Sequence, residues 1–62
     1  METKYVIFDS DSKRYFTYNL NGEYHWVRNI KDAHHMDKSD AKIIIPRLNK
    51  GIYEIVEIII NN

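Results

Sequence analysis

Three histidines and one aspartate are the side chains of this sequence best suited to binding a metal ion. His34 and His35 are adjacent, Asp37 follows them closely, and His25 precedes them. Imidazole nitrogens and carboxylate oxygens are common ligands of Zn²⁺. However, neighbouring side chains point in different directions, and no two histidines have the i, i+4 spacing that places a pair on one helix face. We therefore predict a polar surface that contacts a partner or responds to pH, and no metal or other cofactor.

The segment Val6–Ser12, VIFDSDS, resembles the strand and Asp-x-Asp motif of haloacid-dehalogenase-type phosphotransferases. In that family the first aspartate, matched by Asp9, is the nucleophile, and the second, matched by Asp11, is a general acid. Those enzymes also need Mg²⁺ held by residues from later strands of a parallel sheet, whereas a hairpin follows here. Because Asp and Ser favour turns, we interpret the segment as a strand followed by a turn. The chain is predicted not to be an enzyme, with no catalytic residues.

The sequence is rich in aromatic residues, with five Tyr, two Phe and one Trp among 62 residues. Rings on a sheet can stack nucleic-acid bases, but such surfaces have a positive groove, and this chain has nine basic and nine acidic residues. We therefore predict no nucleic-acid partner. Since Tyr and Trp are enriched at protein interfaces, we predict a protein-binding surface. Its residues are Tyr15, Tyr24, Trp26, His34, His35 and the terminal Ile58, Ile59 and Ile60.

The three terminal isoleucines place apolar side chains on both faces of a strand, which is a liability at an open sheet edge. The strand is therefore expected to be central in the sheet, or to pair with a symmetry mate or another protein. Glu54 and Glu57 are three positions apart, which breaks strict alternation. This spacing predicts a bulge, or a strand covered on both faces.

Length and composition limit how this chain can be stabilised. A domain of 62 residues buries only about 60% of the surface of its unfolded chain. The absence of cysteine excludes disulfides and thiolate zinc sites, so we predict a homodimer. No apolar run approaches the roughly 20 residues needed to cross a bilayer. Acidic residues interrupt the first twenty positions, so no signal peptide is expected there. We therefore expect a cytoplasmic protein with no membrane segment.

Three strands are predicted in the first half of the chain, over residues 4–8, 14–20 and 23–27. Residues 14–20 alternate with period two, with Tyr15 and Thr17 on one face and Phe16 and Tyr18 on the other. The dipeptide Asn21-Gly22 predicts a hairpin with a type I′ turn, in which both residues have positive φ.

One main helix is predicted after a short helical turn over residues 28–36. Asp37 is the expected N-cap, and an apolar stripe follows at i, i+3, i+4 and i+7: Ala41, Ile44, Ile45 and Leu48. Pro46 should kink the helix or end it near Ile45, and Gly51 should close it in the left-handed conformation. The sequence therefore predicts one α+β domain over residues 1–62, with an antiparallel sheet of about four strands (β-β-β-α-β) packed on one helix.

The order of these motifs resembles that of small single-domain proteins of phages and mobile elements. The pattern comprises KYVIFDS, a hairpin containing YF, W-x3-I-x2-A-x2-M-D-x2-D-A, an apolar helix and a closing YEIVEI. The matching residues extend over nearly the whole chain: Trp26, Ile30, Ala33, Met36, Ala41 and 53–58. That group shares no catalytic residues. The resemblance implies a phage origin and a role in binding and blocking a host protein, including components of antiviral defence.

Two functions are therefore expected. The first is a non-enzymatic protein-binding module, a phage-encoded inhibitor that occludes a bacterial defence protein with its aromatic sheet face and terminal isoleucine strand. The alternative is a protein that sequesters a small ligand or nucleotide between two copies of the chain, with Tyr, His and Arg14 or Arg28 around it. A dimer interface is needed because pockets for such ligands are typically about 300 Å³ or more, which one small domain rarely encloses.

Overall fold

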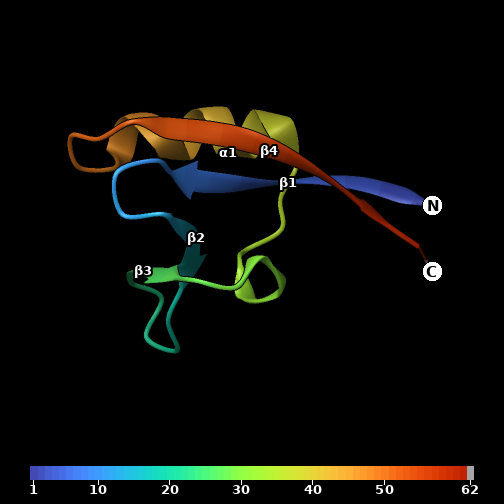
Figure 1. Cartoon of the computed structure of the whole chain (residues 1–62), viewed down its shortest axis with the longest axis horizontal. Coiled ribbons are helices and arrows are strands. Elements are labelled where there is room, and N and C mark those ends of the chain that lie inside the picture. Colours follow the sequence, from blue (N-terminus) through green and yellow to red (C-terminus); the bar gives the residue numbers. More distant parts are fainter. Residues whose placement is uncertain (62) are drawn as a thin grey trace.

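The computed structural model describes residues 1–61 and contains one antiparallel sheet and one short α-helix (Figure 1). The sheet has four strands in the order β3-β2-β1-β4. The elements in chain order are β1 (Glu2–Asp9), β2 (Arg14–Tyr18), β3 (Tyr24–Val27), the 3₁₀ turn η1 (Ile30–Asp32), α1 (Lys38–Ile44), the 3₁₀ turn η2 (Ile45–Arg47) and β4 (Tyr53–Ile60). The predicted α+β fold and the β-β-β-α-β order are confirmed. Within residues 1–61, no helix is long and apolar enough to cross a membrane.

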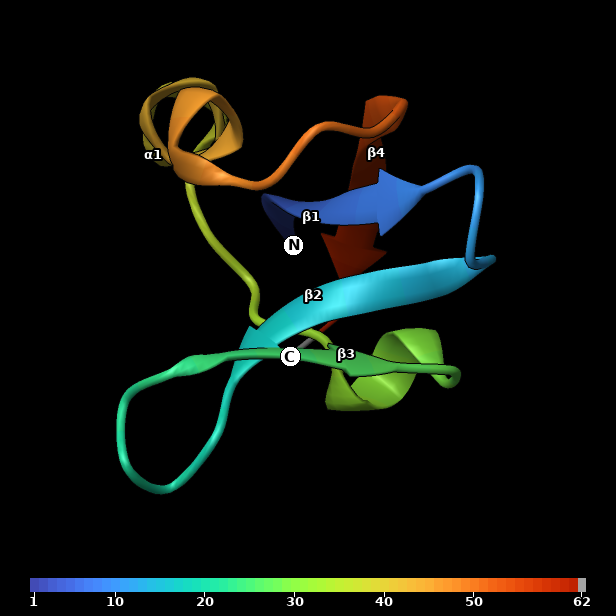
Figure 2. The ribbon, with the colours of Figure 1, turned by 90° about the vertical axis from the view of Figure 1, so that its left-hand side faces the viewer.

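Strand β1 lies inside the sheet and is buried on both faces. Its consecutive residues Val6 and Ile7 are both inaccessible to solvent, although successive side chains of a strand point to opposite faces. Ile7 faces α1 and forms the core with Phe16, Met36, Ala41 and Ile44. Figure 2 shows α1 and η1 on opposite sides of the sheet. The core is therefore small, and Phe16 is its largest buried side chain.

Helix α1 presents the predicted apolar stripe to the sheet. Ala41 and Ile44 are buried, and Ile45 and Leu48 pack against the same core from the turn that follows. The α-helix ends at Ile44, and Pro46 occupies the first turn of η2, where its missing N–H costs no hydrogen bond. Of the two outcomes predicted for Pro46, a kink or an end of the helix near Ile45, the structure shows the end.

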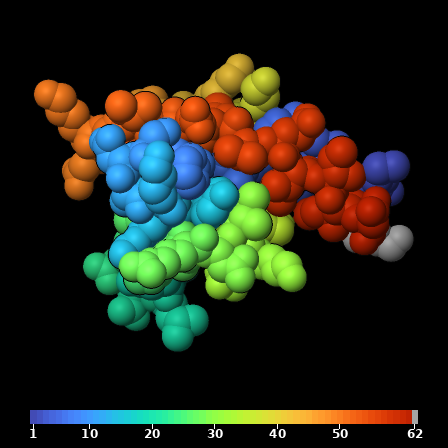
Figure 3. Space-filling model, in the orientation of Figure 1, coloured from blue at the N-terminus to red at the C-terminus, as the bar shows by residue number. Residues whose placement is uncertain are grey.

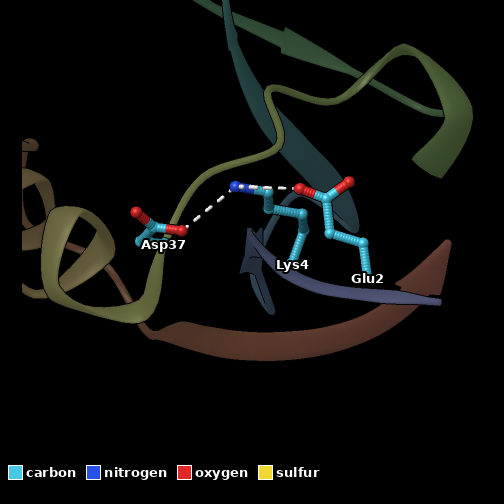
Figure 4. Close-up of polar contacts among 3 residues, drawn as sticks. All are labelled: Glu2, Lys4 and Asp37. Atoms are coloured by element: carbon cyan, nitrogen blue, oxygen red, sulfur yellow. Dashed lines mark hydrogen bonds and ion pairs between the residues drawn. The ribbon is translucent and has the colours of Figure 1, made fainter.

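Asp37 is the N-cap residue, as predicted, but its carboxylate does not cap the helix. Instead, Asp37 Oδ1 accepts a hydrogen bond from Lys4 Nζ at 3.1 Å, and Glu2 Oε1 lies 3.7 Å from the same nitrogen (Figure 4). The hydrogen bond and the negative charge of Asp37 raise the pKa of Lys4 above its ordinary value of 10.5. The ammonium group is therefore charged at neutral pH and links β1 to the start of α1.

The segment between η1 and α1 lies between β1 and β2, which pair directly only at Phe8–Tyr15 and Asp9–Arg14. The N–H of His34 donates to the Phe16 carbonyl on β2, and Met36 exchanges both backbone hydrogen bonds with Tyr5 on β1. The predicted helical turn is thus limited to Ile30–Asp32, and the residues after it are extended. This extended segment joins the η1 side of the sheet to the α1 side (Figure 2).

Strand β4 is an edge strand, so the central one of its two predicted placements is wrong, and pairing with a symmetry mate or another protein stays a prediction. It pairs along its whole length with β1, from Glu2–Ile60 to Asp9–Tyr53, in one continuous register. The predicted bulge is therefore absent from this ladder. The spacing of Glu54 and Glu57 instead places the two carboxylates on opposite faces of an ordinary strand.

The β2–β3 connection is longer than the predicted two-residue turn. The strands end at Tyr18 and begin again at Tyr24. Gly22 has a positive φ of 79°, but Asn21 does not have a positive φ, so the type I′ prediction is wrong. The loop is organised by Asn19, whose Oδ1 accepts hydrogen bonds from the N–H groups of Asn21 and Glu23. This side-chain bonding to nearby backbone stabilises an alternative to the tight turn.

Candidate protein-binding surface

Aromatic side chains cluster on the half of the sheet formed by β2 and β3, around the buried Phe16. Its ring contacts those of Tyr18, Tyr24 and Trp26 edge to face, with centroid distances of 5.0, 5.3 and 5.8 Å. The His34 imidazole lies 5.0 Å from the Tyr18 ring. We call Tyr18, Tyr24, Trp26 and His34 the aromatic surface.

The backbone explains why the aromatic surface forms. Phe16 is opposite Trp26 and Tyr18 is opposite Tyr24 in the β2–β3 register, so all four side chains lie on one face. His34 joins them because its N–H is bonded to the carbonyl of Phe16. Edge-to-face ring pairs of this kind contribute about 0.5–1.5 kcal/mol beyond burial. The surface is therefore held in place by its own contacts.

The two tyrosines are the accessible part of the aromatic surface. Tyr18 is 39% exposed and Tyr24 is 44% exposed, whereas Trp26 and His34 are half-buried. Each tyrosine combines an apolar ring fixed against Phe16 with a phenolic hydroxyl that can donate or accept a hydrogen bond. The rings can contact apolar groups of a partner while the hydroxyls hydrogen-bond its polar groups, and the tyrosine side chains lose little entropy on binding.

Tyr53 connects the aromatic surface to β4. Its ring is stacked on Trp26 at 5.8 Å with an interplanar angle of 13°, although β3 and β4 are the two edge strands of the sheet. The sheet must therefore curl around Phe16. The Tyr53 hydroxyl donates to the Asn49 carbonyl oxygen. Burial, followed by the negative charges of Asp9 and Asp11, raises the pKa of Tyr53 above its ordinary value of 10.0, so the phenol stays neutral at physiological pH.

Gly51 lies beneath the Tyr53 ring, and this contact corrects the predicted role of the glycine. Its backbone is not left-handed, and α1 has ended well before it. A β-carbon at this position would lie 2.9 Å from the Cζ and hydroxyl oxygen of Tyr53. A side chain at this position would displace the Tyr53 ring, so the glycine is favoured by the close ring and not by a positive φ.

We predict that Gly51→Ala destabilises the protein by about 1–3 kcal/mol, the usual range for overpacking. The added methyl group should push Tyr53 away from Trp26 and from Asn49. Urea unfolding followed by Trp26 fluorescence measures both the stability and the environment of the stacked indole. Gly22→Ala is the comparison, because no atom lies within 4 Å of its added β-carbon and only backbone strain is introduced. An unchanged Trp26 spectrum in Gly51→Ala would contradict this assignment.

The structure brings together three of the predicted site residues: Tyr24, Trp26 and His34. Tyr15 is separate from them, because it is on the opposite face of β2 and its ring contacts Phe8 at 4.9 Å. The adjacent histidines are separated, as expected, since His34 packs on the rings while His35 is exposed. Tyr18 is absent from the predicted site residues, although its alternation with Phe16 places both on one face.

The terminal isoleucines form a second apolar region, at the far end of β4 from Tyr53. Ile59 is 59% exposed, and Ile58 and Ile60 are half-buried on the opposite face. There β4 is paired with the start of β1, and the two strands extend together beyond the rest of the sheet (Figure 1). The isoleucines are thus distinct from the aromatic surface.

Asp9 is the last residue of β1 and Asp11 lies in the turn that follows, which agrees with the interpretation of this segment as a strand and a turn. One Asp9 oxygen accepts the N–H of Asp11 and the other accepts the Ser12 hydroxyl, while Lys13 has a positive φ of 60°. Among residues 1–61, no three His, Asp or Glu side chains are grouped so that they could hold a metal ion, and no pocket is present. The alternative of a ligand site between two copies stays a prediction.

Comparisons of the chain with protein-family models, curated proteins and solved structures find no match. The function proposed for the chain therefore depends on the geometry of its own surfaces. The aromatic surface is the best-defined of these, because its rings are ordered around a buried phenylalanine and two of them remain accessible.

Proposed function

We propose that this chain is a non-enzymatic protein-binding module whose aromatic surface covers a site on a partner protein. The observation that carries the proposal is the pair of accessible tyrosines, Tyr18 and Tyr24, fixed against buried Phe16. Fixed aromatic rings lose little entropy on binding and exclude water from a large contact area. Aromatic residues are also the ones that most often dominate the binding energy of protein interfaces.

The resemblance to phage and mobile-element proteins motivates the choice of partner. We propose that the chain is phage-encoded and acts in the host cytoplasm as an inhibitor of a bacterial antiviral defence protein. Occlusion suits a chain of this size, since a standard interface buries about 800 Å² per partner and needs no reaction. The formal net charge of zero favours a protein partner over nucleic acid.

The experiment compares the wild-type chain with the double variant Tyr18→Ser/Tyr24→Ser. Both tagged proteins are used to recover partners from lysates of several low-GC bacterial hosts, and the recovered proteins are identified by mass spectrometry. A defence protein should be recovered by the wild type and at least about tenfold less by the variant, since loss of two interface tyrosines typically exceeds 1.4 kcal/mol. Expression of the wild type should also raise phage plating efficiency only in hosts that carry that defence system.

His25→Ser is the matched control, because His25 neighbours Tyr24 on β3 but points to the opposite face. It should recover the partner as well as the wild type does. Circular dichroism must show that the double variant is folded at the assay temperature. The proposal fails if no partner is recovered from any host, or if the folded double variant and His25→Ser recover the same protein equally.

A further inference from the structure

The outer edge of β4 carries a row of backbone hydrogen-bonding groups. Tyr5, opposite Glu57 in the ladder, directs its N–H and C=O away from β4 to Met36. Ser10, in contrast, donates its N–H to the Ile52 carbonyl. In an antiparallel ladder, residue pairs that exchange backbone hydrogen bonds alternate with pairs whose backbone groups point away from each other. The residues of β4 in the second kind of pair therefore direct their N–H and C=O groups away from β1: Tyr53, Ile55, Glu57 and Ile59.

Two exposed charges, Glu54 and Glu57, are the protection that this edge carries against strand pairing, and the other usual devices are missing from it. Between Tyr53 and Ile60 there is no Pro, Gly or Lys, and the register with β1 is continuous. Figure 3 shows the atoms of β4 along one side of the molecule, with no other element covering them on that face. The opposite edge, β3, has only four residues, which itself limits pairing. Strand β4 is therefore the edge suited to association.

We propose that β4 pairs antiparallel with β4 of a second copy of this chain, with the two-fold axis beside Val56. The two sheets then form one continuous sheet across the dimer. Ile55 lies opposite Glu57 of the second copy, and Tyr53 lies opposite Ile59 of the second copy. These pairs join the outward-facing backbone groups of both strands, as an antiparallel ladder requires.

Charge and strand length select this register. An axis beside Glu57 would place the two Glu57 carboxylates directly opposite each other, which is destabilising. An axis beside Ile55 would place Ile59 opposite Gly51, where the chain bends outside the strand. The axis beside Val56 pairs all residues from Tyr53 to Ile59 and leaves each glutamate opposite an isoleucine.

The same register covers the exposed apolar side chains of the strand region. Ile52 is 62% exposed and would lie opposite Ile60 of the second copy, while Ile59, 59% exposed, would lie beside Tyr53. A net charge of zero gives no overall repulsion between two copies. The edge is thus self-complementary, because two copies in this register pair their apolar side chains and place no like charges directly opposite each other. The aromatic surface takes no part, so this inference does not rest on the proposed function.

The register is tested with single cysteines, because the chain has none of its own. Val56 faces itself across the axis in a non-hydrogen-bonded pair, whose Cα separation of about 4.5 Å suits a disulfide. Mild oxidation should therefore convert Val56→Cys to a covalent dimer. Ile58→Cys is the control on the same face, because an offset of four residues at about 3.4 Å each puts the two cysteines about 14 Å apart. Crosslinking of Ile58→Cys as fast as Val56→Cys, or of neither, overturns the proposal.

Pairing through the edge is tested with Glu57→Pro. The Glu57 N–H points away from β1, so proline should leave the β1–β4 ladder intact and block the second copy. In sedimentation equilibrium, the wild type should approach twice 7.5 kDa, while the variant should have a dissociation constant at least about 100-fold higher. Glu57→Thr, which keeps the N–H, should stay dimeric. A wild-type mass of 7.5 kDa at every loading, or a folded Glu57→Pro that dimerises normally, overturns the proposal.

Discussion

Replacement of Phe16 by alanine is expected to leave most molecules unfolded at 25 °C. Phe16 is the largest completely buried side chain, and its ring contacts Tyr18, Tyr24, Trp26 and His34. Removing a buried phenylalanine typically costs about 3–5 kcal/mol, because apolar contact is lost and a cavity remains. The core of so small a domain rarely supplies more than about 3–5 kcal/mol, so this one change can remove the whole stability.

Urea unfolding at several protein concentrations measures this loss, with circular dichroism and Trp26 fluorescence as independent signals. Tyr24→Ala is the matched control, since it removes a ring from the same cluster that is 44% exposed. The loss in free energy of unfolding should be smaller for Tyr24→Ala than for Phe16→Ala by about 1 kcal/mol or more. Comparable losses in the two variants would show that Phe16 is not the centre of the core.

Local periodicity predicted those parts of the fold that depend on which side chains face the core. The spacing of Ala41, Ile44, Ile45 and Leu48 identified the helix face, and all four pack against the core. The effect of Pro46 was predicted as a kink or a helix end, and the structure shows the end, because its missing N–H acts on the helix locally. Such features depend on neighbours in the sequence, so the sequence is sufficient to predict them.

The errors concern strand order and backbone contacts between distant segments. The isoleucines of β4 predict a central strand or one paired with another molecule, whereas the inner strand beside β4 is β1, whose consecutive apolar residues Val6 and Ile7 are both buried. The hydrogen bonds that place His34 and Met36 between β1 and β2 join backbone groups, which every residue carries. They therefore leave no pattern of residue types in the sequence.

The candidate site was predicted in part for the same reason. Alternation along β2 correctly separated Tyr15 from Phe16 and Tyr18, but the predicted surface grouped Tyr15 with Trp26, which lies on the Phe16 face. What alternation could not give was the contact of Trp26 with Tyr53, because it depends on the curl of the whole sheet. The short-range pattern thus defines the faces of the sheet, and the tertiary structure decides which residues of one face meet.

Replacement of Val6 by aspartate is expected to destabilise the protein by about 4 kcal/mol at pH 7 and to make its stability depend on pH. Val6 is completely buried on the face of β1 opposite Ile7. Burial can raise the pKa of a carboxyl group by about 3 units, and each unit corresponds to about 1.4 kcal/mol. In the folded state the new carboxyl group therefore keeps its proton, whereas in the unfolded state it loses it above about pH 3.9.

The sign of the pH dependence follows from this difference in bound protons. The folded variant holds more protons than the unfolded variant, so its free energy of unfolding falls as pH rises from about 4 to the raised pKa. The difference in free energy of unfolding between the wild type and Val6→Asp should be smallest near pH 3.5 and largest above the raised pKa. Urea unfolding of both proteins at each pH measures that difference directly and removes the effects of the other ionisable groups.

Thr3→Asp provides the control, because Thr3 is exposed on the same strand. It should change stability by less than about 0.5 kcal/mol and show no comparable pH dependence. A deficit for Val6→Asp that is equally large at pH 3.5 and pH 7 would mean that lost packing alone is responsible. A small deficit at both pH values would mean that the face of β1 opposite α1 is open to water, because only a hydrated carboxylate avoids the cost of burial.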